Sequence, residues 1–266
     1  MAATSLLKVK SFCVITGASR GYGRCIAEKL ATNLPKDSTF LLLARDTQQL
    51  ATVKENINTL NDSVQVMYEK FDQSSLNECS QSNIRNILSK NKIEMKNFDQ
   101  ILIIHNAGTV GDLTKFAWEM TDISSVETAM NLNVTGTILL NAALLSEVRN
   151  SNVGFKVVIN ISSLAAVQAF SSWSVYCSGK AARDMFFQTL AKEDSTIKVL
   201  NWAPGPLDTD MQKQCRQSAD DTIRQLCNDL YKDGKLVRCE DSVAKLIVAL
   251  DNNTFESGQH IDYFDV

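Results

Sequence analysis

A chain of 266 residues is longer than an average domain, but a single α/β sheet of seven strands can fill this length without a second core. Apolar residues make up 44% of the chain and charged residues 21%, which is ordinary for a soluble globular protein. The net charge of −3 and the pI near 5.5 argue against nucleic acid as a partner, because that binding depends on neutralising phosphates.

The cysteines and the first residues bear on the cellular compartment. The seven cysteines are an odd number without a Cys-x-x-Cys pair, so free thiols are favoured over disulfides or a metal site. No run of 18 apolar residues predicts a membrane span, and residues 1–11 lack the apolar core of a signal peptide. We therefore expect a cytoplasmic protein with no metal and no membrane partner.

Short apolar runs alternate with segments of helical periodicity along the chain. Strands are expected at 12–16, 39–44, 64–68, 101–105, 156–161, 197–202 and 259–263. Helices are expected from Ile26 onward and at 46–60, 75–90, 123–149, 173–192 and 241–250. This alternation predicts an α/β fold with a doubly wound, mostly parallel sheet and helices on both faces. No linker or repeat divides the chain, so residues 1–266 are expected to form one domain.

The segment after the first predicted strand is rich in glycine. TGASRGYG occupies residues 16–23, and a helical pattern follows directly. Strand, glycine turn and helix form the context of a phosphate-binding loop, in which Gly17, Gly21 and Gly23 let the backbone approach a pyrophosphate. The N-terminus of the helix adds unpaired N–H groups for the anion. A simple turn is the alternative interpretation.

Tyr176 and Lys180 lie four residues apart in YCSGK, and therefore on one face of a predicted helix. A free phenol titrates at a pH of about 10, and a neighbouring cation lowers that pKa, which makes the tyrosine a usable acid or base. Ser163 follows the apolar run 156–161, whose strand would bring its hydroxyl to the same place. Taken alone, the pair could equally be a buried ring beside a solvated lysine.

These motifs, together with HNAG at 105–108, resemble the short-chain dehydrogenase/reductase family over nearly the whole chain. The resemblance implies a single-domain Rossmann fold with a Ser–Tyr–Lys centre that is usually completed by an asparagine. The matching catalytic residues are Ser163, Tyr176 and Lys180, with Asn133 of NLNVTG as the fourth.

The resemblance also implies where a nicotinamide cofactor would bind. His105 departs from the family, which often has asparagine there, but the turn after it is expected to keep its main-chain contacts to the cofactor. The expected cofactor-binding residues are Gly17, Ala18, Ser19, Arg20, Gly21, Tyr22, Gly23, Arg45, Asp46, Asp72, Gln73, Asn106, Ala107, Gly108, Tyr176, Lys180, Gly205, Pro206, Leu207, Asp208, Thr209 and Asp210.

Two arginines bear on the choice of cofactor. The second predicted strand ends in FLLLARD, which places Arg45 where an enzyme using NAD would normally have an acidic residue. Arg20, in the glycine turn, can approach the same position. Paired guanidinium groups suit a 2′-phosphate, so we expect NADPH and NADP+. In the alternative, Arg45 is solvated and Asp46 binds the ribose.

The sixth predicted strand is followed by APGPLDTDM, at the carboxyl edge of the sheet where ligands bind. Two of the three prolines of the chain bracket Gly205 in this stretch. The polar segment 211–235 comes directly after it and is expected to be a lid over the substrate.

Three stretches narrow the substrate: NISSLAAVQAFSSWSVYCSGKAARDMFFQ, NWAPGPLDTDMQ and SGQHIDYFDV. Together they resemble the pterin reductases of the family, in which a carboxylate near the C-terminus holds the pterin. The matching residue is Asp262, whose carboxylate can accept both bonds from the guanidine-like edge of a pterin, as it does from arginine. An ordinary surface acid is the alternative. Ser163, Leu164 and Tyr176 complete the expected substrate contacts.

The resemblance implies hydride transfer from NADPH to a ketone on the pterin side chain. Ser163 is expected to hold the carbonyl oxygen, and Tyr176 to protonate it. Lys180 is expected to lower the pKa of Tyr176 and to hold the nicotinamide ribose. Asn133 is expected to bend its helix and to hold a water that returns protons to Lys180.

Three other functions stay open. A general carbonyl reductase for steroids, quinones or small diketones would have no use for Asp262, because these substrates lack a guanidine-like edge. A non-catalytic module that senses NADPH would be expected to lose part of the Ser–Tyr–Lys set, which this chain keeps. An interaction scaffold would need an exposed apolar motif, and the sequence contains no clear one.

Two predicted helices bear on oligomerisation. The stretch 134–148 has almost no polar face, so its helix must be buried on more than one side. The helix that carries Tyr176 is also apolar beyond the active site, at Ala181, Ala182, Met185, Phe186 and Leu190. We expect both helices to pair with their copies across a two-fold axis in a homodimer. Burial under the segment 211–235 is the alternative.

Overall fold

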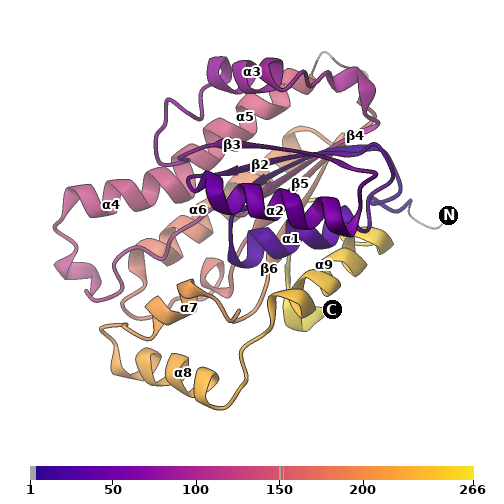
Figure 1. The fold of residues 1–266 in the computed structure, drawn as a ribbon. Coiled ribbons are helices and arrows are strands. Elements are labelled where there is room, and N and C mark those ends of the chain that lie inside the picture. Colours follow the sequence, from indigo (N-terminus) through magenta and orange to yellow (C-terminus); the bar gives the residue numbers. More distant parts are fainter. Residues whose placement is uncertain (1–3, 150, 152) are drawn as a thin grey trace.

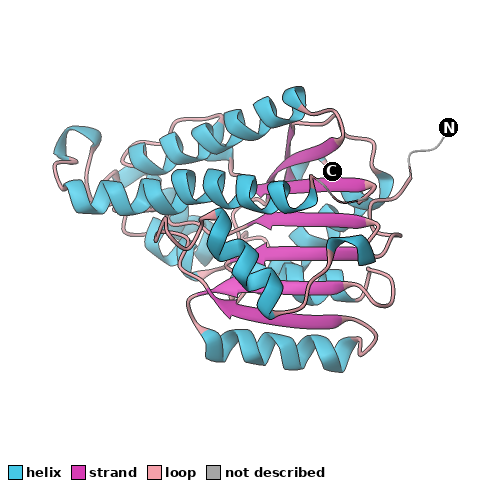
Figure 2. Cartoon of the chain, turned by 90° about the horizontal axis from the view of Figure 1, so that it is seen from above, coloured by secondary structure: helices cyan, strands magenta, loops and turns pink. Residues whose placement is uncertain are grey.

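The structure, a computed structural model, describes residues 4–149, 151 and 153–266, so residues 1–3 of the expected single domain lie outside it. Seven parallel strands form one sheet in the order β3-β2-β1-β4-β5-β6-β7. Figure 2 shows their arrows pointing the same way. The α/β prediction is confirmed, with a sheet that is fully rather than mostly parallel. The strands are β1 (Ser11–Thr16), β2 (Thr39–Ala44), β3 (Gln65–Lys70), β4 (Gln100–His105), β5 (Phe155–Ile161), β6 (Ile197–Ala203) and β7 (Gln259–Asp262).

Helices cover both faces of the sheet and make three layers (Figure 1). One face carries α1 (Gly21–Ala31), α2 (Thr47–Leu60) and α9 (Cys239–Asn252). The other face carries α3 (Gln81–Lys90), α5 (Gly136–Val148) and α6 (Ser174–Glu193), with α4 (Ile123–Met130) leading into α5. Two short helices, α7 (Asp210–Cys215) and α8 (Asp221–Lys232), lie below the end of the sheet in Figure 1.

The strand side chains alternate between the two helical layers. In β1, Cys13 and Ile15 pack toward α1, α2 and α9, whereas Phe12 and Val14 pack toward α3, α5 and α6. All six residues of β1 are buried, which explains why the central strands read as continuous apolar runs rather than alternating ones. The sheet is therefore the middle layer between two apolar cores.

Some helix boundaries differ from the predicted ones. Helix α3 begins at Gln81 and not at residue 75, because the Ser80 hydroxyl caps it by accepting a bond from Asn83 N at 3.4 Å. The expected helix 123–149 is divided by a π-helical turn, Asn131–Thr135. The polar segment 211–235 contains α7 and α8, which its composition did not predict.

The continuous helical segment Ile123–Val148 is long and apolar enough to cross a membrane by composition, with a mean hydropathy of 1.2 over 18 residues. In this fold, many of its apolar residues pack against the sheet. Leu140, Leu144 and Val148 are fully buried against the sheet, whereas Leu139 on the opposite side is 39% exposed. Helix α5 therefore covers the sheet with one side and leaves an apolar side uncovered in the single chain.

Candidate active site

The predicted site residues lie at the carboxyl edge of the sheet, in the loops that follow its strands. The glycine turn follows β1, the HNAG turn ends β4, and Ser163 follows β5. Asp262 ends β7, opposite Ala203 at the end of β6. Because every strand is parallel, these segments meet at one edge although they span most of the sequence.

The glycine turn has the geometry that its three glycines permit. Gly17 and Gly21 have φ values of +64° and +54°, which glycine adopts without strain. A Cβ on Gly23 would lie 2.3 Å from Gly17 O and 2.4 Å from Asn106 Nδ2, so only glycine fits between these groups. Arg20 occupies the N-cap of α1 and its side chain cannot accept a hydrogen bond, so the first-turn N–H groups carry no cap from it.

The glycine turn and the HNAG turn are joined through Thr16 and Asn106. Thr16 Oγ1 accepts bonds from the main-chain nitrogens of Asn106 and Ala107, at 3.0 and 2.9 Å. In return, Asn106 Nδ2 donates to Thr16 O at 2.9 Å and to Gly17 O at 3.2 Å. The four bonds fix the end of β1 against the end of β4.

His105 points away from the site into the core. The ring is fully buried, and its Nε2 lies 3.2 Å from Asn141 Oδ1 on α5. Burial, followed by the positive charge of Arg183, lowers the pKa of His105 to about 3, so the ring is neutral. The departure from asparagine thus leaves the bonds of Asn106 and Ala107 in place, and the main-chain contacts of the turn to a cofactor stay a prediction.

Two of the expected cofactor-binding residues use their side chains elsewhere. The Tyr22 hydroxyl accepts a bond from Trp202 Nε1 at 2.8 Å and lies 3.0 Å from Ser242 Oγ, inside the core. Gln73 Nε2 donates to Leu132 O at 2.8 Å and to Thr137 Oγ1 at 2.9 Å. For Tyr22 the predicted contact is therefore restricted to the main chain, whereas Gln73 Oε1 is buried without a hydrogen-bond partner among the described residues.

The groups expected to read the adenosine ribose lie at the surface. Arg45 is exposed, and Arg20 Nη1 makes an exposed ion pair with Asp210 Oδ2 at 3.2 Å. Asp46 caps α2, because its Oδ1 accepts from Gln49 N at 3.0 Å and its Oδ2 from Gln49 Nε2 at 3.1 Å. Asp46 is thus oriented by its role as the cap of α2.

Ser163, Tyr176 and Lys180 come together as the sequence predicts. The Tyr176 side chain is buried and lies close to the Ser163 side chain, whose Oγ accepts a bond from Ala165 N at 3.1 Å. Lys180 Nζ lies 5.7 Å from the centroid of the Tyr176 ring and donates to Ile161 O at 2.6 Å. A strand end and one helical turn thus present two hydroxyls and an ammonium to the same edge of the sheet.

The pKa of Tyr176 is raised rather than lowered in this structure, and the expected effect of Lys180 on it stays a prediction. Burial raises the pKa of Tyr176 to about 12, and the groups that oppose this rise are the Ser163 hydroxyl and the Arg183 charge. Burial and the Arg183 charge also lower the pKa of Lys180 well below 10.5, while Asp184 acts in the other direction. The phenol is therefore protonated at neutral pH, which is the form that donates a proton.

Asn133 lies in the π-helical turn between α4 and α5, so the expected irregularity of this helix is present. Its side chain bonds both main-chain groups of Thr109: Oδ1 accepts from Thr109 N at 2.9 Å, and Nδ2 donates to Thr109 O at 2.8 Å. A Cβ on Gly179 would lie 3.4 Å from Asn133 Cβ, so α6 passes close to the turn just before Lys180. The turn thus ties the loop after β4 to the catalytic helix.

Asp262 is half-buried and oriented by a short helical turn, Tyr263–Asp265. Its Oδ1 accepts a bond from Phe264 N at 3.0 Å, and its own N–H donates to Asp265 Oδ2 at 2.8 Å. In the part of the chain that the structure describes, no donor binds Asp262 Oδ2. One oxygen of an ordered carboxylate is thus left for a ligand, at the same edge as Ser163 and Tyr176.

The two ends of the predicted lid are joined to each other. Val237 N donates to Pro206 O at 2.9 Å, and Asp208 N donates to Val237 O at 3.0 Å. Between these ends, α7 and α8 are connected by a bond of 2.7 Å from Gln212 Nε2 to Cys227 O. The segment 211–235 therefore contains two helices in contact, and the residues that flank it are hydrogen-bonded to each other.

The inner side of this segment packs beside the predicted proton donor. Ala219 N donates to Leu113 O at 2.8 Å, which ties the loop between α7 and α8 to the loop after β4. The apolar cluster that joins the two parts consists of Val110, Leu113, Ala165, Tyr176, Cys215 and Cys227. This packing is what the lid interpretation requires.

Arg183 is a site residue that the sequence analysis missed. It is fully buried, and its guanidinium donates to His105 O at 2.5 Å, Ala107 O at 3.0 Å and Asn160 Oδ1 at 2.8 Å. Arg183 thus holds the HNAG turn against α6. The available signal was KAARD, where charged residues follow Lys180 by three and four positions, on its own face of an otherwise apolar helix.

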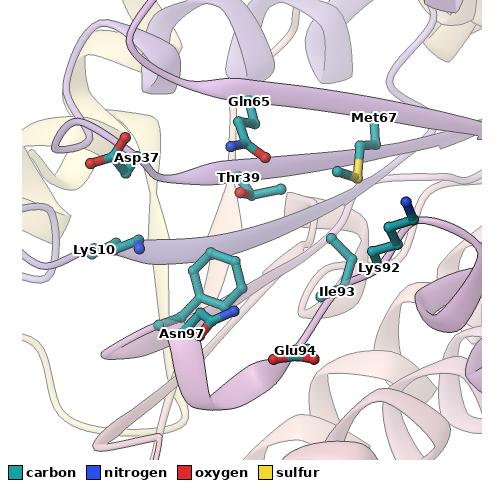
Figure 3. A pocket seen from close by; sticks show the side chains of 10 residues that line it. Lys10, Asp37, Thr39, Gln65, Met67, Lys92, Ile93, Glu94 and Asn97 are labelled. Carbon is teal, nitrogen blue, oxygen red and sulfur yellow. The ribbon is translucent and has the colours of Figure 1, made fainter.

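A separate pocket lies at the opposite, amino edge of the sheet (Figure 3). Its volume is about 220 Å³, and none of the predicted site residues lines it. It is lined by Lys10, Asp37, Thr39, Gln65, Met67, Lys92, Ile93, Glu94, Asn97 and Phe98. The lining contains two lysines and two carboxylates, so its charges give no preference for an anionic or a cationic ligand. The described residues also contain no group of three His, Cys, Asp or Glu side chains that could hold a metal.

Residues 11–220 match the family model for the short chain dehydrogenase. The chain belongs to this family. It is similar to the sepiapterin reductase of Rattus norvegicus, with 40% identity over 96% of both chains. It is also similar to the benzil reductase ((S)-benzoin forming) of Bacillus cereus, with 28% identity over 94% of this chain and 98% of that protein. The crystal structure of the KRED1-Pglu enzyme shares the fold, with a TM-score of 0.77, 23% identity, and coverage of 95% of this chain and 100% of that one.

Proposed function

We propose that this chain uses NADPH to reduce ketones on the side chains of pterins. The reactions are sepiapterin to dihydrobiopterin, and 6-pyruvoyl-tetrahydropterin to tetrahydrobiopterin, the final step of tetrahydrobiopterin synthesis. The identity of 40% with the rat sepiapterin reductase over nearly the whole chain supports the proposal. The structural observation that carries it is Asp262, an ordered carboxylate at the same edge of the sheet as Ser163 and Tyr176.

The residues at the carboxyl edge fit NADPH. The turn of Gly17, Gly21 and Gly23 has the positive φ values and close approaches that a pyrophosphate loop needs. Arg20 and Arg45 are the cations for the 2′-phosphate, for which planar guanidinium groups are suited. The main chains of Ala18, Ser19, Tyr22, Asn106, Ala107, Gly108 and Gly205 through Asp210, with Asp72 and Gln73, complete the proposed cofactor site.

Bound NADPH supplies the hydride, and the chain supplies position and a proton. Ser163 and Tyr176, which lie close together, hold the carbonyl oxygen of the substrate between their hydroxyls. Tyr176 donates its proton to that oxygen as negative charge develops. Lys180 keeps two N–H donors beyond its bond to Ile161 O, and these hold the ribose of the nicotinamide. Both polar groups of the Asn133 side chain are bonded to Thr109, so its main-chain carbonyl is the group proposed to hold the water through which protons return to Lys180.

The segment 211–235 acts as the lid of this site. Its underside packs on Tyr176, and its two ends meet at Pro206 and Val237, so the segment can move as a unit while its base stays in place. Leu164, which is 44% exposed beside Ser163, is a proposed substrate contact under the lid.

We also propose a homodimer and a cytoplasmic location. Leu139 on α5 and Met185 on α6 are 39% and 62% exposed, so the segment 211–235 does not cover them and the alternative burial does not apply to them. Pairing of α5 and α6 with their copies across a two-fold axis would bury both side chains. The seven free cysteines favour a reducing compartment, which is the support for the cytoplasm.

The proton-donor role predicts that Tyr176→Phe keeps NADPH binding and loses ketone reduction. Removal of one positioned acid is expected to lower kcat by about 10²- to 10⁴-fold. NADPH affinity, measured by fluorescence titration, is expected to change little, whereas Lys180→Ala should weaken both binding and turnover. Near-normal turnover in Tyr176→Phe would mean that the proton comes from another group.

The cofactor preference predicts that Arg45→Ala raises the KM for NADPH far more than the KM for NADH. Loss of one charge-assisted bond to the 2′-phosphate costs about 1.5–3 kcal/mol, or roughly ten- to a hundredfold in affinity. Arg24→Ala serves as a control, because Arg24 pairs with Glu28 on α1. Equal losses with both cofactors would make Arg45 structural and leave the preference to Arg20.

The dimer is tested by light scattering at micromolar concentration. The account predicts twice the chain mass of 29.4 kDa, and a shift to 29.4 kDa in Leu139→Glu, which places a charge in the proposed apolar interface. A monomer mass for the unaltered protein would reject the dimer. Tyr231→Glu, at an exposed position of α8, is the matched control and should leave the mass unchanged.

The substrate role of Asp262 gives the most selective test of the proposed function. Asp262→Asn removes the charge and places an amide donor where the pterin edge needs an acceptor, at an expected cost of about 1–3 kcal/mol, or roughly 5- to 150-fold. A small diketone reaches Ser163 and Tyr176 without this contact, so its kcat/KM should not change. The ratio of kcat/KM for sepiapterin to that for the diketone should collapse in the variant. An unchanged ratio would favour a general carbonyl reductase.

A further inference from the structure

Strand β7, which ends in Asp262, is the least supported strand of the sheet. It has four residues and pairs with β6 alone, so its ladder holds it along one side only. None of its four residues is fully buried. A substrate contact at its end therefore depends on whatever fixes β7 against the catalytic helix.

That fixing contact is made by His260 and Asp184. His260 Nδ1 lies 2.6 Å from Asp184 Oδ2 on α6, and the two side chains are 18% and 4% exposed. Side chains two residues apart on a strand point to the same face, so His260 and Asp262 both face the layer of α6. Ile261 between them packs into the opposite core, with α1 and α9. His260 thus ties the catalytic helix to the face of β7 that also presents Asp262.

Asp184 also reaches the strand that positions Ser163. Its Oδ1 accepts bonds from Ser162 Oγ at 2.6 Å and from Asn160 Nδ2 at 2.9 Å. An ionised carboxylate accepts but cannot donate, so with both bonds to Oδ1 the bond at Oδ2 assigns the donor role to His260 Nδ1. Asp184 is therefore the point where β5, α6 and β7 meet.

The contact has the strength to act as a geometric constraint. Asp184 is almost fully buried, so loss of the His260 donor would leave one carboxylate oxygen without a partner in the interior. The hydrogen bond from Asp184 raises the pKa of His260 above its ordinary value, and burial of the ring acts in the opposite direction. Within one turn of Asp184, Lys180 and Arg183 hold the carbonyls of β5 and of the HNAG turn. These bonds, with the two to Asp184 Oδ1, hold α6 in place without His260, so loss of the His260 bond releases β7 rather than the catalytic helix.

We propose that Asp184 and His260 are positioning residues that set the place of Asp262 relative to Ser163 and Tyr176, and so determine selectivity for a substrate that must reach both ends of the site. This inference rests on the proposed pterin function. It assigns to His260 a part in substrate selection without contact to the substrate. A substrate held only at Ser163 and Tyr176 does not depend on the position of β7. Such a substrate, a small diketone, is therefore the reference against which the effect on sepiapterin is measured.

Two substitutions distinguish the effect of losing the His260–Asp184 hydrogen bond from the effect of losing the imidazole ring. His260→Leu keeps much of the volume but removes the donor, whereas His260→Asn places an N–H close to the position of Nδ1 and does not titrate. In His260→Leu, the KM for sepiapterin should rise about tenfold, as for the loss of one charge-assisted bond, with kcat nearly unchanged. The kcat/KM for a small diketone should stay within about twofold in both variants, and His260→Asn should restore most of the sepiapterin KM.

The pH dependence is a second readout, because His260 is the titrating member of the pair. Below its raised pKa it is charged and the ion pair with Asp184 is complete, and the pair weakens as the pH rises through that pKa. The charged groups on the elements around it are Arg183 and Asp184 on α6, Asp262 on β7, Asp265 after β7, and Lys245 on α9. The KM for sepiapterin should therefore rise toward alkaline pH in the unaltered protein, and this rise should be absent in His260→Asn.

The outcomes distinguish this inference from the proposed function. If the unaltered protein reduces sepiapterin selectively but His260→Leu loses activity toward both substrates alike, or keeps its selectivity, the positioning role is wrong. If the unaltered protein does not prefer sepiapterin at all, the proposed function fails and the selectivity role fails with it. Should His260→Leu not fold, the pH profiles of the unaltered protein and His260→Asn decide, and identical profiles would overturn the inference.

Discussion

The burial of charge on helix α6 is the constraint on which the site depends. Lys180, Arg183 and Asp184 are at most 4% exposed, and buried charges of this kind are costly unless each is paired or hydrogen-bonded. The pairing comes from several parts of the fold at once: Ile161 O at the end of β5, the carbonyls of the HNAG turn, and His260 on β7. Because the charged residues of α6 need these partners, the helix fixes the proposed cofactor side and substrate side of the site relative to each other.

Much of the fold and of the catalytic set could be predicted from local sequence. The buried central strands read as continuous apolar runs, and the partly buried edge strands β3 and β7 were also found within two residues of their bounds. The glycine turn and the Tyr176–Lys180 pair were found because each role requires particular residue types at fixed spacing. The lid was expected from its polarity and its place after the sixth strand. Its helix α8 was missed although Asp220 caps it and Ile223, Cys227 and Leu230 recur at helical spacing.

The residues that the sequence did not reveal act through contacts that only the topology creates. Asp184 and His260 are 76 residues apart, and nothing in either segment indicates the other. The pKa of Tyr176 is raised although a cation lies nearby, because the spacing of Lys180 does not reveal the depth at which both groups are buried. Burial outweighs proximity here, so the tyrosine is kept in its acid form. That form suits the donation of a proton to a ketone oxygen.

The central claim is that the site is built for a pterin rather than for any reactive ketone. It is tested most directly by NADPH oxidation in the unaltered protein, with sepiapterin and a small diketone measured side by side at the same pH and ionic strength. The account predicts a kcat/KM for sepiapterin that exceeds that for the diketone by more than about tenfold, the discrimination that one buried charge-assisted contact provides. Equal values, or a preference for the diketone, would contradict it.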